Sequence, residues 1–415
     1  MRRKRKMKMM KLESESFKEY KTDVDSFRKP VAAYHKVLHD GSLPMTGWVG
    51  LPLRSDAGAL EKILSAGEEI REKYTALVVV GIGGSYLGTR ACYDMLRSEC
   101  SGAELFFAGW NLGSSYHARL LKKLENYDVA LCVVSKSGTT METALAFDLL
   151  KTYLKNRYGE QYTDRIYVVT DETRGALRRE AEEKGYRAFS LDSDIGGRYS
   201  VLTAVGLLPL AAAGVDIVSL IDGAKQAYED FSAPEPDENP CYQYAAFRNV
   251  MFKAGKSIEF FSFSEPEMSR FGYWLRQLFA ESEGKNGVGI YPASLNYSTD
   301  LHSVGQFLEE GHPVFFETML TLGSHAADLA VEGHDKTYNE YIAAAAEAVY
   351  HVRNAKNTPM IWLTMSALNA ENVGYMIYFF EKACAMSCLL MGVNPFDQPG
   401  VEAYKKEMRA LLGIE

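Results

Sequence analysis

CVVSKSGTTMET, residues 132–143, begins as an apolar run and ends as the start of a helical pattern. Between the two lies SKSGTT, residues 135–140, a cluster of hydroxyl groups with one lysine and one glycine. A short apolar run that passes through such a turn into helical periodicity is typical of a strand and helix in a parallel α/β sheet. Ligands of these sheets bind beyond the carboxyl ends of the strands. Hydroxyl donors at this turn therefore indicate a site for a small anion.

The same order of strand, turn and helix recurs along the chain. The stretch FSAPEPDENP, residues 231–240, is rich in proline and acid without periodicity and predicts a junction between two α/β units. The pattern at 371–391 is apolar on most faces and predicts a buried helix. Continuous apolar strands are expected where helices cover both faces of a parallel sheet. The apolar runs lie at 76–80, 129–134, 166–169, 257–263, 288–291, 314–318 and 360–365.

Length and composition are those of an ordinary globular protein. The 415 residues suggest two domains or one large α/β unit, and 47% hydrophobic with 24% charged residues allow a large core. The net charge of −8 argues against nucleic acid as the main partner, although a small anionic substrate needs only local donors. The six cysteines do not make a disulfide framework, and Cys384 and Cys388 are interpreted as core residues.

Two segments could be interpreted as a leader or a membrane span, and neither interpretation is favoured. The basic start MRRKRKMKMMK, residues 1–11, lacks the apolar region of a secretory signal and is expected to be a solvated, frayed terminus. The longest uncharged run, residues 199–215, contains Pro209 and two glycines and is expected to lie in the core. These features predict a cytoplasmic protein without membrane contacts.

A second glycine-containing turn, GIGGS at residues 81–85, follows the first strong strand. Its glycines permit positive φ and close approach of backbone N–H groups to a ligand, and a helix N-terminus follows. A dinucleotide fingerprint would need glycine where Tyr86 stands, and the Gly-Lys-Ser/Thr end of a Walker A loop is absent. Either turn alone could be ordinary helix capping by Ser or Thr. Two such turns on adjacent strands predict one phosphate site.

Three further stretches combine glycine with charged residues: DIGGRYS at 194–200, ESEGKNG at 281–287 and FDQPGVEAYK at 396–405. Each alone could be a solvated turn or helix end, because Arg, Lys and Glu are mostly exposed. Together with GIGGSYLG, SKSGTT and STDLHSVGQ at 298–306, they occur in the order and spacing of the glucose-6-phosphate isomerase family. The chain resembles compact bacterial members of that family over about residues 50–410.

The resemblance implies two sugar isomerase (SIS) domains. Each would be a three-layer α/β/α unit with a parallel sheet flanked by helices, and terminal helical arms would complete the chain. We place an N-terminal arm at 1–60, the first domain at 61–230 and the second domain, with C-terminal helices, at 231–415. The implied activity is aldose–ketose isomerisation of glucose 6-phosphate and fructose 6-phosphate, in glycolysis and gluconeogenesis. It would run through ring opening and a cis-enediolate, without metal or organic cofactor.

The resemblance also implies roles for individual residues. Glu281 would move the proton between C2 and C1, and Arg198 would stabilise the enediolate. His302 and Lys405 would serve ring opening, with the histidine reaching the site from the neighbouring subunit of a homodimer. The implied substrate-binding residues are Gly84, Ser85, Ser135, Lys136, Ser137, Thr139, Thr140, Gln277 and Gln398.

Alternatives remain open on the sequence alone. A SIS-domain regulator would bind a sugar phosphate without turnover, although the matched acid–base residues argue against it. An isomerase that also accepts mannose 6-phosphate is not distinguished. Glu283 occupies the variable position of its motif and is assigned no role. His35 and His39 have a spacing that could bind a metal, but no third ligand is evident, so no metal site is expected.

Overall fold

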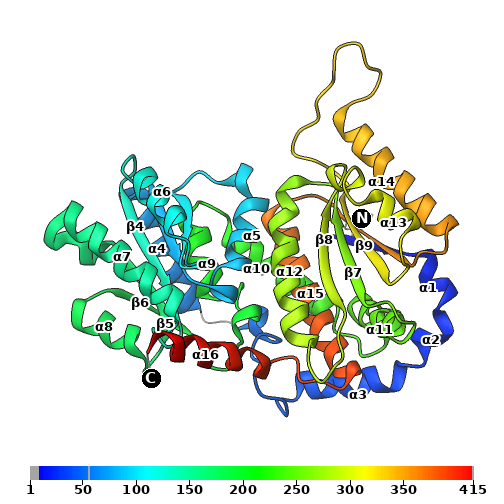
Figure 1. Cartoon of the computed structure of the whole chain (residues 1–415), viewed down its shortest axis with the longest axis horizontal. Coiled ribbons are helices and arrows are strands. Elements are labelled where there is room, and N and C mark those ends of the chain that lie inside the picture. Colours follow the sequence, from blue (N-terminus) through cyan, green and yellow to red (C-terminus); the bar gives the residue numbers. More distant parts are fainter. Residues whose placement is uncertain (1–8, 55–56, 414–415) are drawn as a thin grey trace, which may run out of the picture.

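The computed structural model describes residues 9–54 and 57–413. Its described strands form two five-stranded sheets, with helices against both faces of each sheet (Figure 1). The layer between the two sheets contains α5 (Leu87–Met95), α10 (Ile217–Asp230), α12 (Ser269–Glu283) and α15 (Ala370–Met391) (Figure 1). The predicted class, parallel sheets flanked by helices, is confirmed.

The first sheet has the strand order β3-β2-β4-β5-β6, and all its neighbouring strands are parallel. Every residue of β2 and β4 is buried, which explains their unbroken apolar composition of Ala, Leu, Val and one Cys. The strands are β2 (Ala76–Val80), β3 (Glu104–Ala108), β4 (Val129–Val134), β5 (Ile166–Asp171) and β6 (Arg187–Leu191). The other helices of this half are α4 (Ala57–Lys73), α6 (Ser114–Leu124), α7 (Met141–Tyr158), α8 (Ala176–Lys184) and α9 (Ala204–Ala212).

The second sheet has the order β1-β10-β9-β7-β8, with β7 to β10 parallel and β1 antiparallel to β10. Its strands are β1 (Met10–Glu13), β7 (Ile258–Phe263), β8 (Tyr291–Asn296), β9 (Phe315–Leu322) and β10 (Met360–Met365). Its further helices are α1 (Glu15–Glu19), α2 (Lys21–Asp25), α3 (Arg28–His39), α11 (Pro240–Lys253), α13 (Gly305–Glu310) and α14 (Tyr338–Ala355). The last helix, α16 (Glu402–Leu412), leaves this half and runs toward the first sheet (Figure 1).

The expectation of a frayed terminus is wrong for its last two residues. Met10 and Lys11 belong to β1 and pair with Met365 and Thr364 of β10. Met10 is buried because this strand adds to the edge of an apolar sheet. Residues 1–8 lie outside the described part of the chain.

Most predicted strands are confirmed, and one is misplaced. The strand expected at 288–291 runs instead over Tyr291–Asn296. Gly287 and Gly289 take φ of +76° and +121°, conformations that cannot continue a strand, so pairing begins only after them. Strands β3 and β6 are not among the sequence-based expectations. Strand β6 is a largely exposed edge strand and therefore lacks an apolar run.

Helix α15 is the centre of the core. It is long and apolar enough to cross a membrane, but 94% of its most apolar window is buried inside the protein. The prediction of a buried helix is thus confirmed, and Cys384 and Cys388 on it are fully buried. The expectation for residues 199–215 also holds, because every residue of α9 is buried.

Candidate active site

The two glycine-containing turns open at the same edge of the first sheet. Strands β2 and β4 are neighbours, with Val80 paired to Val133, so their carboxyl ends lie side by side. GIGGS follows β2 and contains a short 3₁₀ helix, η2 (Gly83–Ser85). SKSGTT follows β4 and leads into α7. The sequence-based expectation that both turns face one site is therefore compatible with the topology.

Glycines bring three segments together at GIGGS. A Cβ atom on Gly84 would lie 2.2 Å from the carbonyl carbon of Gly197, in the turn η5 (Gly197–Tyr199) that carries Arg198. At Gly83, which has φ +57°, a Cβ atom would lie 2.9 Å from Nε2 of Gln277 on α12. At Gly84 only glycine permits this approach, because real Cβ atoms do not come so close to backbone, and at Gly83 the positive φ favours glycine.

The SKSGTT loop presents hydroxyl groups at an uncapped helix end. Ser137 Oγ accepts from Thr139 N at 3.1 Å and lies 2.9 Å from Thr139 Oγ1, while buried Ser135 accepts from Gly138 N at 3.0 Å. Thr140 is the N-cap residue of α7, but its side chain caps no amide. Ordinary capping therefore does not explain Thr140, and the amides of the first turn of α7 suit an anion.

Lys136 connects this loop to the segment before Arg198. Its Nζ donates to the backbone oxygen of Ser193 at 3.4 Å. Lys136 is exposed, and Ser85 is half-buried at the end of η2. Five predicted phosphate-site hydroxyls thus lie on two neighbouring loops: Ser85, Ser135, Ser137, Thr139 and Thr140.

Arg198 is the buried cation of the site, with 3% of its side chain exposed. Its Nε donates to Ser282 Oγ at 2.7 Å and Nη1 donates to Gln398 Oε1 at 3.0 Å. Nη2 donates to the backbone oxygens of Pro395 at 2.6 Å and Asp397 at 3.2 Å. Arginine has five N–H groups, so these bonds leave one N–H on Nη1. That nitrogen lies 3.6 Å from Glu281 Oε2.

Glu281 stands on the last turn of α12, between two donors. Gln277, one turn earlier, donates from Nε2 to Glu281 Oε2 at 3.0 Å, and Arg198 Nη1 faces the same oxygen. About a quarter of the Glu281 side chain is exposed, at 26%, so a substrate carbon can reach it. Gln277 Oε1 is buried and accepts no hydrogen bond from the described residues, which suits a sugar hydroxyl.

Two predicted site residues have no hydrogen bond or ion pair with this group in the described part of the chain. His302 is exposed and follows β8, whose last residue Asn296 accepts a hydrogen bond from Ser269 at 2.8 Å. Ser269 begins α12, and at about 1.5 Å per residue Glu281 lies about 18 Å further along that helix. Lys405 lies on α16, where its Nζ donates to Glu402 at 2.8 Å.

Ser282 and the 394–398 segment hold Arg198, and sequence reasoning did not single out this role. Ser282 lies inside the quoted ESEG motif, so its position was a usable signal. The carbonyl groups of Pro395 and Asp397 leave no signal, because any residue provides one. Lys285 fixes the same segment by bonding to the Asp397 carboxylate at 2.7 Å and to the Asn394 carbonyl.

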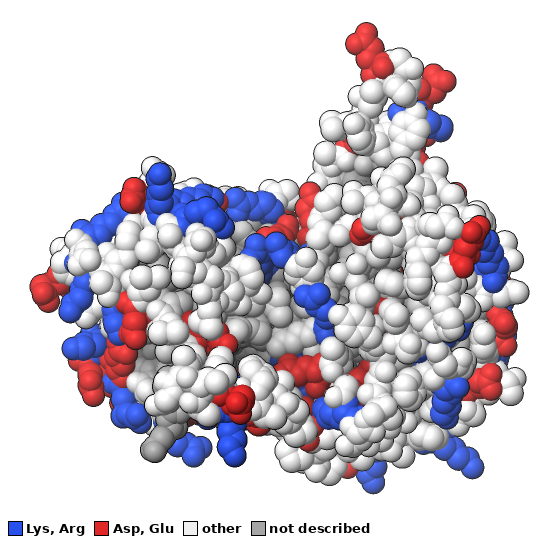
Figure 2. Space-filling view, viewed as in Figure 1, with Lys and Arg blue, Asp and Glu red and all other residues white. Residues whose placement is uncertain are grey.

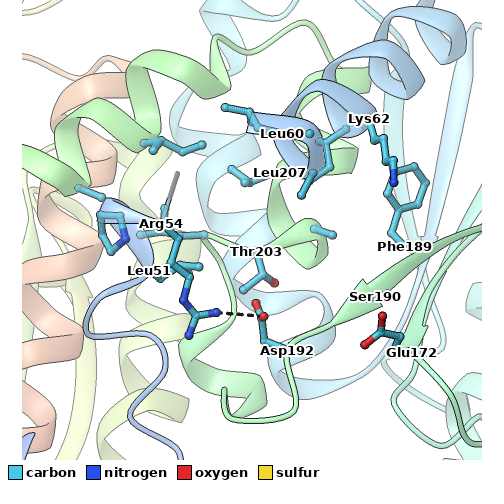
Figure 3. A pocket seen from close by; sticks show the side chains of 18 of the residues that line it. Leu51, Arg54, Leu60, Lys62, Glu172, Phe189, Ser190, Asp192, Thr203 and Leu207 are labelled. Atoms are coloured by element: carbon cyan, nitrogen blue, oxygen red, sulfur yellow. Dashed lines mark hydrogen bonds and ion pairs between the residues drawn. The ribbon is translucent and has the colours of Figure 1, made fainter. Parts of the chain in front are cut away.

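The large cavity in Figure 3 is not this site. Its volume is about 730 Å³, and none of the predicted site residues lines it. It lies beside the edge strand β6, with Leu51, Phe189 and Leu207 among its apolar lining (Figure 3). Arg54 and Asp192 pair there at 3.1 Å.

In the space-filling view, Lys and Arg gather over the upper part of the first half, around the cleft between the two halves (Figure 2).

No metal centre is found among the described residues, because no group of three or more His, Cys, Asp and Glu could hold an ion there. The rings of His35 and His39 stack with centroids 4.3 Å apart, and His35 Nδ1 lies 2.8 Å from the Tyr242 hydroxyl. Burial, aided by the nearby charge of Lys382, lowers the pKa of His39 to about 4. These histidines are packing residues.

Comparisons with known proteins agree on one family. The model of the phosphoglucose isomerase family matches residues 60–326. Glucose-6-phosphate isomerase of Alkaliphilus metalliredigens (strain QYMF) is 43% identical, with 94% of this chain and 92% of the relative covered. The enzyme of the same name from Clostridium tetani is 42% identical, with 92% and 90% covered.

The chain belongs to the phosphoglucose isomerase family. As a phosphoglucose isomerase it interconverts glucose 6-phosphate and fructose 6-phosphate reversibly, an aldose–ketose isomerisation. The regulator alternative is not favoured. Among solved structures, a hypothetical protein from Thermus thermophilus superimposes with TM-score 0.87 at 28% identity, covering 97% of this chain and 100% of that one. A glucose-6-phosphate isomerase from Chlamydia trachomatis has the same fold, with TM-score 0.85 at 20% identity and coverage of 98% and 89%.

Proposed function

We propose that Glu281 is the base that carries the proton between C2 and C1 of the open-chain sugar phosphate. The observation that supports this role is the placement of its Oε2 between Gln277 Nε2 and Arg198 Nη1. A single carboxylate on one side of the cis-enediolate can remove the proton from one carbon and return it to the other.

Arg198 is proposed to stabilise the enediolate. Its side chain is fixed by four hydrogen bonds, so its free N–H is already oriented when negative charge develops on the sugar oxygens. A guanidinium stays protonated and does not compete with Glu281 for the proton. Gln277 and Gln398, which bond to Glu281 and Arg198, are proposed to contact the sugar.

The phosphate group is proposed to bind at the edge shared by GIGGS and SKSGTT. Hydroxyls of Ser85, Ser135, Ser137, Thr139 and Thr140, the amides at the start of α7 and the charge of Lys136 support this placement. Gly84 keeps the first loop close to Arg198. The phosphate would thereby fix the distance between the reacting carbons and Glu281.

His302 is proposed to act in the site of a second subunit. His302 is exposed and follows β8, whose end bonds to Ser269 at the opposite end of α12 from Glu281; this supports the role, since a ring-opening acid must contact the same sugar. The protruding loop that leads into α14 (Figure 1) exposes Leu329, at 62%, and the first residue of α14, Tyr338, is exposed at 61%. A second copy of the chain would cover these residues.

Lys405 is proposed to act at the ring oxygen. It follows Gln398 by seven residues, and Gln398 already bonds to Arg198, so α16 begins close to the candidate site. Sugar binding would draw Nζ from Glu402 to the substrate. We further propose the boundaries 1–60, 61–230 and 231–415, of which the boundary at 230 is supported by the two separate sheets. A cytoplasmic location is also proposed, supported by the family's sugar-phosphate substrate.

Substitution of the proposed base tests the mechanism directly. Glu281→Gln keeps the shape of the side chain but removes its basicity, so kcat for fructose 6-phosphate should fall by several orders of magnitude in the presence of EDTA. Glu183→Gln, on the exposed surface of α8, is the matched control and should keep full activity. A Glu281→Gln enzyme with more than a tenth of wild-type turnover would refute the assignment.

A further inference from the structure

The last turn of α12 carries a second glutamate that the mechanism does not use. Glu283 lies two residues after Glu281, about 200° further around the helix, so the two side chains point in nearly opposite directions. Glu281 faces the site, and Glu283 is completely buried on the core side. A buried carboxylate requires partners, and these partners decide what the residue does.

Both oxygens of Glu283 are held by groups from three different elements. Oε2 accepts from Arg248 Nη2 of α11 at 2.9 Å and from the Ile290 amide, ahead of β8, at 3.4 Å. Oε1 accepts from Ser387 Oγ of α15 at 2.8 Å. The end of α12 is thereby tied to a strand connection and to two core helices.

Arg248 shares its charge with a further carboxylate. Its Nη1 donates to Glu259 Oε2 of β7 at 2.5 Å, and Thr318 Oγ1 donates to the other oxygen of Glu259 at 2.7 Å. Burial opposes the charge of Arg248, but Glu259 and Glu283 outweigh this and raise its pKa. Burial also raises the pKa of Glu259.

Stability is a weak explanation for this network. Buried ion pairs recover little more than the cost of removing their charges from water, and well-packed apolar groups often stabilise a core as well. Charge-assisted hydrogen bonds do, however, fix direction and distance better than apolar contacts. What they fix here is the backbone of residues 281–283.

We propose that Glu283 is a positioning residue for Glu281 and Arg198, an inference that rests on the proposed function. Through the backbone it sets where Glu281 stands relative to the sugar. Through Ser282, which accepts the Nε–H of Arg198 at 2.7 Å, it also sets the direction of the guanidinium. One buried residue, Glu283, thus positions both the proposed base and the proposed cation.

Glu283→Gln and Ser387→Ala test the positioning role of Glu283 with a larger and a smaller change to its hydrogen bonds. The first replaces the carboxylate with an uncharged group of the same shape, and the second removes one hydroxyl donor. We expect kcat to fall by about 10–100-fold in Glu283→Gln and about 3–10-fold in Ser387→Ala, with KM changed less than about 3-fold, because misplacement of the base affects the transition state most.

Ser262→Ala is the matched control for Ser387→Ala. Ser262 is also fully buried and donates to a buried glutamate, Glu317 at 2.5 Å, but it lies on β7 and its hydrogen bond holds no part of α12. It should lower thermal stability to a similar extent and leave kcat within about 2-fold of the wild type. Thermal denaturation of every variant separates loss of folded protein from loss of catalysis.

The outcomes separate the inference from the function on which it rests. The positioning role alone is overturned if the wild type isomerises fructose 6-phosphate and kcat is unchanged in both Glu283→Gln and Ser387→Ala. It is also overturned if Ser262→Ala lowers kcat as much as Ser387→Ala does. A wild-type protein that does not isomerise fructose 6-phosphate overturns both. If Glu283→Gln does not fold, Ser387→Ala against Ser262→Ala decides the question.

Discussion

Alanine at Gly84 would push two active-site turns apart. Its Cβ atom would lie 2.2 Å from the carbonyl carbon of Gly197 and 2.7 Å from the amide nitrogen of Arg198. Both contacts are with backbone, so no side chain can rotate away. Restoring an ordinary separation of about 3.4 Å requires a displacement of about 1 Å between η2 and η5. A misplacement of that size costs about 100-fold in rate, and we expect such a loss in kcat/KM for fructose 6-phosphate.

Gly196→Ala is the matched control, because it adds the same methyl group to the facing turn, next to Gly197. The nearest atom to its Cβ would be Met45 Cε at 4.0 Å, so nothing has to move. Isomerisation is followed by a coupled assay, and thermal denaturation establishes that each variant is folded. A folded Gly84→Ala enzyme with kcat/KM within about 3-fold of Gly196→Ala would refute the argument that this close approach sets the site.

Three further predictions concern charge, assembly and pH. Arg198→Lys leaves most of the four bonded acceptors without a donor and should lower kcat by about 100–1,000-fold; turnover near wild type would contradict the role of the fixed guanidinium. Glu281→Gln and His302→Ala are each expected to be inactive alone. When the two variants are mixed and reassembled, half of the dimers contain one intact site, so up to about a quarter of wild-type activity should return. If subunit exchange is proven and no activity returns, His302 does not act across the subunit interface. His39 has its pKa lowered to about 4 in the folded protein, mainly by burial, so the stability that it contributes is complete above about pH 6.5 and declines as pH falls toward 4. Urea unfolding should therefore show a larger loss of stability from about pH 7 to about pH 5 in the wild type than in His39→Gln, and equal losses would contradict the assigned shift.

The sequence predicted those parts of the fold that follow from local patterning. Strands β2 and β4 are buried on both faces and carry unbroken apolar runs, so their predicted limits agree with the observed ones. The misplaced strand near residue 288 shows the opposite case, because Val288 and Ile290 belong to an apolar run whose glycines take positive φ. Strand β1 could not be expected from its basic surroundings, since its pairing with β10 joins residues far apart in the sequence.

The candidate site likewise contains residues that local motifs predict and residues whose importance depends on contacts with distant parts of the chain. Motifs predicted that Arg198, Gln277 and Glu281 would be functional, and the structure brings these three together. Motifs could not reveal Glu283, because its importance depends on Arg248 and Ser387, which lie on other helices and form no local pattern with it. Nor could they place His302, whose proposed role depends on a second chain.

The bonds that hold Arg198 have a consequence for synthesis of the protein on the ribosome. Arg198 lies in the first half of the chain, while its partners Pro395, Asp397 and Gln398 are made about 200 residues later. Until those residues emerge, three of its five N–H groups lack their final acceptors, and Gln398 is not in place beside the guanidinium. A nascent or truncated chain can complete its first sheet early but has no oriented cation for the reaction. If Arg198 has its proposed role, activity should therefore appear only when almost the entire chain has been made.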